Sequence, residues 1–140
     1  MYQPRTYHHW VREEGLVSFR VVVRETDLYL RAQKKLEKEA LGATLRYRAC
    51  LEQYIMSHPL FMTALEPVDV EDDAPQLVRD MAEAAKKAGV GPMAAVAGVI
   101  AEVVGRELMA MSPEVIVENG GDIFIAALKT TMVGVYAGNS

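Results

Sequence analysis

Hydrophobic and polar residues alternate near the start of the chain, and this alternation predicts a hairpin. Four apolar side chains are separated by single residues: Val17, Phe19, Val21 and Val23. A period of two is typical of a half-buried strand. Glu25-Thr26-Asp27 supplies turn-forming side chains, and Leu28-Tyr29-Leu30 is expected to return as the second strand.

Apolar residues at steps of three and four predict three helices in the middle of the chain. The first covers about 33–57 and ends where His58 precedes Pro59. An irregular stretch, 60–73, separates it from a second helix at about 75–88, which Gly89 is placed to cap. The third runs over about 93–110 and stops near Ser112-Pro113. The expected buried stripes of the first two are Leu36, Ala40, Ala43, Tyr47, Leu51 and Tyr54, then Leu77, Met81, Ala84 and Ala88.

Three strands are expected to finish the chain, at 114–118, 122–126 and 131–137. The order ββ-ααα-βββ keeps strands and helices apart. It predicts an α+β fold in which an antiparallel sheet has helices packed on one face. A single domain covers 1–140, with 1–14 as a loose N-terminal arm.

Composition narrows the classes of function. The chain is 51% hydrophobic and 24% charged, which is typical of a globular protein and excludes a mainly disordered one. Residues 1–60 hold ten Lys and Arg against seven acids, and residues 61–140 hold five against twelve. Because the basic residues are few and are interleaved with acidic ones, the composition argues against nucleic-acid binding.

Cysteine content and apolar run lengths point to a cytoplasmic setting. Cys50 is the single cysteine, so no internal disulfide can form, and no Cys/His zinc spacing exists. The first ten residues are polar and aromatic, unlike a signal peptide, and the longest apolar run, 93–101, is too short to cross a membrane.

Small residues mark the helix after Pro92 as a candidate ligand surface. They share one stripe: Ala94, Ala97, Gly98, Ala101 and Gly105. Each glycine costs a helix about 1 kcal/mol, so a missing side chain must be required there, either by close packing or by a flat ligand. The turn Val90-Gly91-Pro92-Met93-Ala94 leaves N–H groups free at the helix start, where a phosphate or carboxylate is favoured. No Gly-Lys-Ser/Thr follows, so this is not a P-loop.

Val117-Glu118-Asn119-Gly120-Gly121-Asp122 is the second candidate. Asn-Gly between apolar runs predicts a type I′ hairpin turn. The second glycine and the flanking acids favour a ligand loop equally well, because glycines admit a close approach and Asn119 and Asp122 can bond a hydroxyl or a ring N–H. Weaker candidates are the acidic run 69–73, which lacks EF-hand spacing, and Glu102, for which an ion pair with Arg106 is expected.

Three segments together carry a resemblance to a known family: Glu25-Thr26-Asp27-Leu28, Ala88-Gly89-Val90-Gly91-Pro92-Met93-Ala94-Ala95-Val96-Ala97-Gly98 with Ile100-Ala101-Glu102, and Val117-Glu118-Asn119-Gly120-Gly121-Asp122-Ile123. They closely resemble an uncharacterised prokaryotic family related to the ApbE-like proteins. Those are FAD:protein FMN transferases, once called thiamine-biosynthesis lipoproteins. The resemblance covers almost the whole chain.

The resemblance implies a T-fold type of architecture, ββ-α-α-ββ, with FAD and Mg²⁺ as cofactors and a partner flavoprotein that accepts FMN on Thr or Ser. The transferases' Gly-Gly-Ile-Ala-Lys-Gly falls on residues 98–103, so Glu102 stands in place of their lysine. Their Asn-x-Gly-Gly-Asp resembles 119–122, where Asn119 is followed directly by Gly120-Gly121-Asp122 without the residue x. Their later Ser/Thr/Asp-rich segments have no counterpart here, so the chain resembles the first part of a longer relative.

Two hypotheses follow. In the first, the protein binds FAD or another nucleotide and transfers FMN when complete. The phosphates then contact Val90, Gly91, Met93 and Ala94. A flat ring lies against Ala97, Gly98 and Ala101, and the resemblance places Glu102 near the flavin diphosphate. The ribose or a ring edge contacts Asn119, Gly120, Gly121 and Asp122. In the second, the chain is a non-enzymatic T-fold-like module that forms a homodimer, and its Gly-rich segment serves packing.

Overall fold

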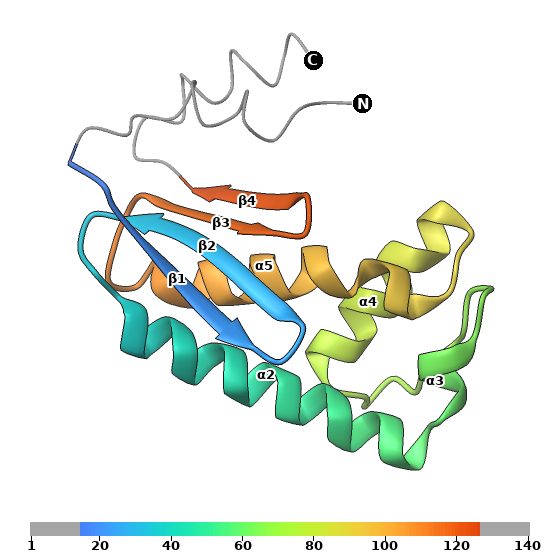
Figure 1. The fold of residues 1–140 in the computed structure, drawn as a ribbon. Helices are drawn as coiled ribbons and strands as arrows, with labels where there is room; N and C mark the ends of the chain where they lie inside the picture. Colours follow the sequence, from blue (N-terminus) through green and yellow to red (C-terminus); the bar gives the residue numbers. More distant parts are fainter. Residues whose placement is uncertain (1–14, 127–140) are drawn as a thin grey trace, which may run out of the picture.

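A four-stranded antiparallel sheet forms one layer of the molecule (Figure 1). The structure, a computed structural model, describes residues 15–126. The strands are β1 (Val17–Val23), β2 (Thr26–Ala32), β3 (Val115–Asn119) and β4 (Asp122–Ala126), in the order β1-β2-β3-β4. The predicted hairpin at the start of the chain and the strands at 114–118 and 122–126 are therefore confirmed.

The first turn lies earlier than predicted. Arg24 and Glu25 form the two-residue turn, with Arg24 at φ 53°, and Thr26 already pairs with Val23. Thr26 faces inward and is buried, which places it in the strand although its side chain suits a turn. The register pairs Leu28 with Asn119, so the beginning of β2 and the end of β3 meet at one end of the sheet.

One face of the sheet is covered by two helices, α2 (Glu37–Ser57) and α5 (Val96–Leu108), which lie against it and against each other (Figure 1). The buried side chains of β1 and β2 alternate along each strand and point to this layer. In β3 Val115, Val117 and Asn119 share that face, and Ile116 is buried on the opposite one. The stripe predicted for α2 is buried or half-buried throughout. The α+β class is confirmed, with α2 and α5 on one face.

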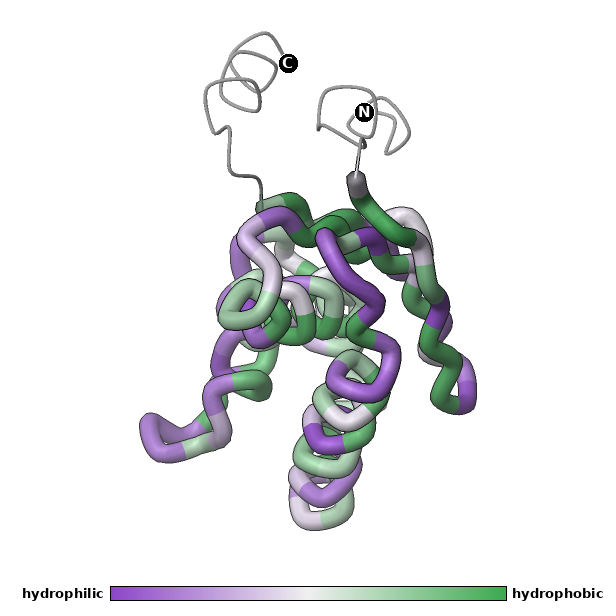
Figure 2. The backbone as a smooth tube through the Cα atoms, turned by 90° about the vertical axis from the view of Figure 1, so that its left-hand side faces the viewer, coloured by the Kyte–Doolittle hydropathy of each residue, from purple (hydrophilic) through white to green (hydrophobic). Residues whose placement is uncertain are grey.

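The remaining helical segments are α3 (Leu60–Thr63), α4 (Gln76–Ala88) and the 3₁₀ turn η1 (Pro92–Ala95). Hydrophilic and hydrophobic residues alternate along the helical turns in Figure 2, as in helices that bury one side. Gly89 adopts a left-handed conformation at φ 71° and caps α4 as predicted. The stripe predicted for α4 is half wrong. Leu77 and Met81 are buried, whereas Ala84 and Ala88 are exposed and the buried positions are Val78, Ala82 and Ala85.

Three further predictions differ from the structure. The first helix begins at Glu37, the third helix divides into η1 and α5, and the stretch 60–73, expected to be irregular, contains α3. The predicted order ββ-ααα-βββ is not confirmed, because residues 15–126 contain four of its five strands and one helix more than predicted. The predicted arm at 1–14 and the strand at 131–137 lie outside the described residues.

Within 15–126, no single helix is long and apolar enough to cross a membrane. The pair formed by α4 and η1–α5 reaches that length and composition only together, with a bend of 102°.

Candidate functional site

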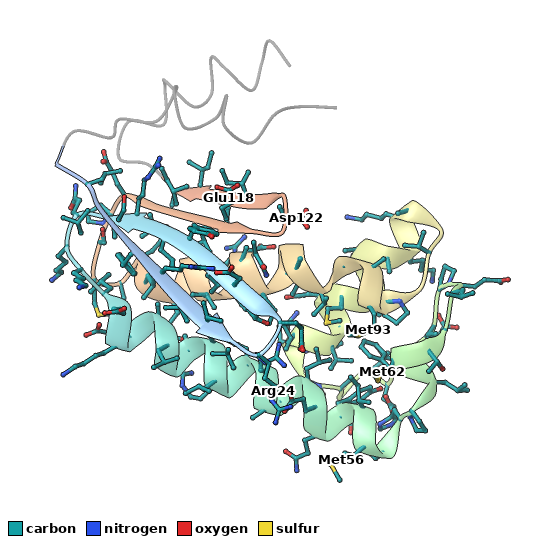
Figure 3. The ribbon with its side chains drawn as sticks, viewed as in Figure 1. Arg24, Met56, Met62, Met93, Glu118 and Asp122 are labelled. Carbon is teal, nitrogen blue, oxygen red and sulfur yellow. The ribbon has the colours of Figure 1, made fainter. Side chains whose placement is uncertain are left out.

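A pocket of about 310 Å³ opens where α2, α3, η1 and α5 meet the β1–β2 turn. We call it the α2–α5 pocket. Met62 from α3 and Met93 from η1 both line it and are labelled in Figure 3, where α3 and η1 lie next to each other. Its lining residues are Glu25, Thr26, Arg48, Leu51, Glu52, Ile55, Met62, Met93, Val96, Ala97, Ile100 and Asn119.

Most of the wall is apolar. Leu51 and Ile55 come from α2, and Val96 and Ile100 come from α5. Methionine side chains adapt their shape to a ligand more readily than branched ones, so Met62 and Met93 form the adjustable part of the wall. Such a surface suits the faces of a flat ring.

The polar end of the pocket is organised by Arg48. Its guanidinium donates hydrogen bonds to Glu25 Oε1 at 2.6 Å, to Glu52 Oε2 at 3.2 Å and to the hydroxyl of Thr26. The side chain of Arg48 is only 14% exposed. The hydrogen bond from Arg48 holds the pKa of the Glu25 carboxyl below its usual range. Because two carboxylates face one guanidinium, the positive charge at this end is compensated.

Asn119 closes the same end from the sheet. It is 8% exposed, and its side-chain Nδ2 donates to the carbonyl oxygen of Ala97 at 3.1 Å. A carbonyl oxygen only accepts, so the amide nitrogen must face Ala97 and the amide oxygen must point away from it. No residue within 15–126 donates to that oxygen. An almost buried acceptor is thus left for a ligand.

The two glycines after Asn119 form the hairpin turn itself. Gly120 has φ 56° and Gly121 has φ 94°, and Asn119 pairs with Asp122. Both central residues of a type I′ turn need positive φ, so the turn alone explains both glycines. The second glycine therefore does not by itself favour a ligand loop, because the positive φ of this turn accounts for it.

Close packing requires only one of the two glycines of the small-residue stripe, Gly105. A Cβ on Gly105 would lie 2.2 Å from Cδ2 of Phe124, so β4 can approach α5 only at a glycine. A Cβ on Gly98 would lie 3.4 Å from Oδ1 of Asp122, which is ordinary contact. Ala101 is buried in the core. Within the stripe, Ala97 lines the pocket.

The turn before α5 also packs tightly. A Cβ on Gly91 would lie 1.9 Å from the carbonyl oxygen of Ala64, so only glycine fits there. The N–H of Val90 bonds Ala85 and that of Ala94 bonds Gly91. Val90, Gly91 and Ala94 do not line the pocket, whereas Met93 does.

The structure thus brings together three of the twelve predicted site residues in the pocket, namely Met93, Ala97 and Asn119. Glu102 pairs with Arg106 at 2.8 Å, as expected, and lies outside the pocket wall. Sequence reasoning missed Arg48, one of ten basic residues in the first half, because nothing local distinguishes it. Glu25 and Thr26 could have been found, since they belong to one of the segments that carry the family resemblance.

A second polar cluster ties the end of α2 to the loop before α4. The Tyr54 hydroxyl donates to Glu71 Oε1 at 2.7 Å, and His58 Nε2 lies 2.7 Å from Glu71 Oε2. The hydrogen bond from Tyr54 is the main cause that lowers the pKa of Glu71 to about 2. Burial, followed by the bond to Glu71, raises the pKa of Tyr54 to about 12. Within 15–126, no group of three or more His, Cys, Asp or Glu could hold a metal ion.

Comparison with known proteins identifies the family. Residues 8–140 match the family described as "AbpE bacteria". The chain belongs to this family. It is 48% identical over 122 residues to the UPF0280 protein of Methanocaldococcus jannaschii and 43% identical over 122 residues to that of Methanopyrus kandleri. A UPF0280 protein of Methanococcus maripaludis is 42% identical over 122 residues. Each match covers 86% of this chain and 49% of the relative. The chain therefore spans about half the length of these UPF0280 proteins.

Proposed function

We propose that this protein binds a flavin or nucleotide in the α2–α5 pocket. The observation that carries the proposal is an apolar pocket with one polar end, where the buried oxygen of Asn119 lacks a donor within 15–126. Ligand sites in proteins are typically apolar cavities with a few placed polar groups. The resemblance to the ApbE-like proteins supplies the ligand class and a T-fold type of architecture as part of the same proposal.

Pocket size limits what enters it. Small-molecule sites range from roughly 300 to 1,000 Å³, so a pocket of about 310 Å³ admits one ring system rather than a dinucleotide. A ring lies between the walls formed by α2 and α5, and the rest of the ligand extends outward. The start of α5 lies at the edge of the pocket, and its first N–H, that of Val96, already donates to the carbonyl oxygen of Met93.

Transfer of FMN to a partner flavoprotein belongs to the proposal only for a longer chain. The described residues do not fit Mg²⁺, because no cluster of metal-ligating side chains lies among them. We therefore derive no step through Mg²⁺.

Filling the pocket tests the function. Riboflavin, FMN, FAD and AMP are titrated into the purified chain, with binding measured by flavin fluorescence and calorimetry. Ala97→Phe places a ring inside the pocket and should abolish binding. Ala84→Phe is the matched control, since Ala84 is exposed on α4 and does not line the pocket. If the unmodified protein binds none of the four ligands, the proposed function is wrong.

Exposed apolar side chains favour assembly as a second candidate function. Met56 at the end of α2 and Leu65 just after α3 are 84% and 87% exposed. Light scattering coupled to size exclusion tests it. A dimer that Leu65→Glu dissociates, with ligand binding unchanged, supports assembly, and a monomer at high concentration contradicts it.

A further inference from the structure

The charge balance at the polar end of the pocket favours a neutral ligand group there. Arg48 already faces two carboxylates, from Glu25 and Glu52. A phosphate or carboxylate brought to this end would be repelled by both. Five N–H groups belong to a guanidinium, and the three bonds of Arg48 leave two without a partner among residues 15–126. Arg48 therefore offers donors to a neutral acceptor, such as a carbonyl oxygen.

Beside these donors lies an acceptor. The amide oxygen of Asn119 has no donor within the described part of the chain, and the bond of Nδ2 to Ala97 fixes which way it points. A buried acceptor without a partner is costly, so the site is completed by an N–H or O–H group.

The sheet register places the two groups at the same end. Asn119 pairs with Leu28, and Thr26 lies two residues along β2 on the same inward face. Diagonal neighbours of this kind are roughly 7–8 Å apart. Thr26 accepts the hydrogen bond from Arg48, so the donors of Arg48 and the acceptor of Asn119 flank one corner of the pocket.

We propose that the α2–α5 pocket selects a ring with a lactam or imide edge, in which an N–H donor stands next to a carbonyl acceptor. The ring N–H donates to the Asn119 oxygen, and the ring carbonyl accepts from Arg48. The ring faces lie against Ile100 and the methionines. Flavin, uracil and guanine rings carry such an edge, whereas adenine has no carbonyl and does not match. This inference rests on the proposed function and names the part of the ligand that is recognised.

The decisive experiment removes one N–H from the ligand. Affinities of riboflavin and N3-methylriboflavin are compared, and likewise uridine and N3-methyluridine, by calorimetry and fluorescence on the chain as it stands. Each methyl derivative keeps the ring and loses only the imide N–H. We expect at least a tenfold weaker affinity for the methyl derivative of whichever ring binds, and weaker binding of adenosine than of that ring.

Protein variants test the carbonyl of the ligand edge, which accepts hydrogen bonds from Arg48. Arg48→Gln removes the guanidinium donors and should weaken binding of the parent ring at least tenfold. Arg46→Gln is the matched control on the same helix, because Arg46 pairs with Glu107 and does not line the pocket. Thermal melting of both variants identifies any loss of affinity that comes from unfolding. The comparison of each ring with its N3-methyl derivative uses the unmodified protein and does not depend on a variant.

The two proposals fail in different ways. Equal affinity for a ring and its N3-methyl derivative, or adenosine binding as tightly as riboflavin and uridine, overturns the imide edge while the pocket remains a binding site. Binding of no flavin, nucleoside or nucleotide overturns both.

Discussion

At the scale of single residues, two glycines in two helices differ in what surrounds them. Gly105 in α5 lies under the Phe124 ring, whereas the space beside Gly42 in α2 is open for at least 4 Å. Glycine lowers helix stability relative to alanine. Replacing each glycine by alanine therefore distinguishes two effects on stability: the low helix propensity of glycine at Gly42, and the close packing that requires glycine at Gly105.

Gly105→Ala should lower the free energy of unfolding by about 1–3 kcal/mol, because the added methyl group overlaps Phe124. Gly42→Ala should raise it by about 0.5–1 kcal/mol, since alanine favours the helix and meets nothing. Urea denaturation measures both. Equal effects of the two changes would show that packing against β4 does not require Gly105.

Another residue-scale feature is the Tyr54–Glu71 hydrogen bond, which makes stability depend on pH. The pKa of Glu71 falls from 4.5 to about 2 in the folded protein, so its ionised form is favoured by folding. That contribution is complete above about pH 4.5 and is lost as pH falls toward 2. The pKa of Tyr54 rises from 10.0 to about 12, so its contribution is complete below pH 10 and is lost as pH rises toward 12.

Glu71→Gln should flatten the decline of stability between about pH 4.5 and 2, because the titrating carboxyl is gone. Glu66→Gln is the control, as an exposed glutamate in the same loop. Melting temperature against pH measures the effect. An unchanged acid limb in Glu71→Gln would contradict the assignment.

At the scale of elements, the β3–β4 hairpin depends on a turn whose two glycines are not equivalent. Gly120 has φ 56°, which asparagine also adopts, whereas Gly121 has φ 94°, which other side chains rarely do. Gly120→Asn should therefore leave stability nearly unchanged, and Gly121→Val should lower it by about 1–2 kcal/mol. Urea denaturation measures the difference. Equal tolerance at both positions would mean that the turn is not of type I′.

Also at this scale, apolar spacing did not predict how the chain enters α5. The apolar spacing after Pro92 fits one continuous helix, and the chain instead forms a 3₁₀ turn over Pro92–Ala95 before α5. Just before this turn Gly91 lies close against the backbone of Ala64, a contact between segments distant in sequence that apolar spacing does not show. The alanines of α4 pose a similar problem. They are similarly apolar, and packing against α5, α2 and η1 decides which of them is buried.

At the scale of the whole molecule, sequence patterns predicted the sheet better than the pocket. Strict alternation placed β1 and β2, and the Asn-Gly signal placed the turn after β3. The pocket needs Arg48, Thr26 and Asn119, which only the register and the crossing of α2 over the sheet bring together. The spacing of residues along the sequence does not show which distant residues contact each other in the fold. Asn119 was found because glycine turns and the family motif both drew attention to it.

The bond between Asn119 and Ala97 has a consequence for the order in which the protein becomes functional. Asn119 belongs to a strand near the end of the described chain, and Thr26 belongs to one near its beginning. A nascent chain that has not yet formed β3 lacks the Asn119 oxygen at the polar corner of the pocket. A ligand held there engages only the finished fold and stabilises it by mass action. Ligand retention can therefore report the moment at which β3 has paired with β2.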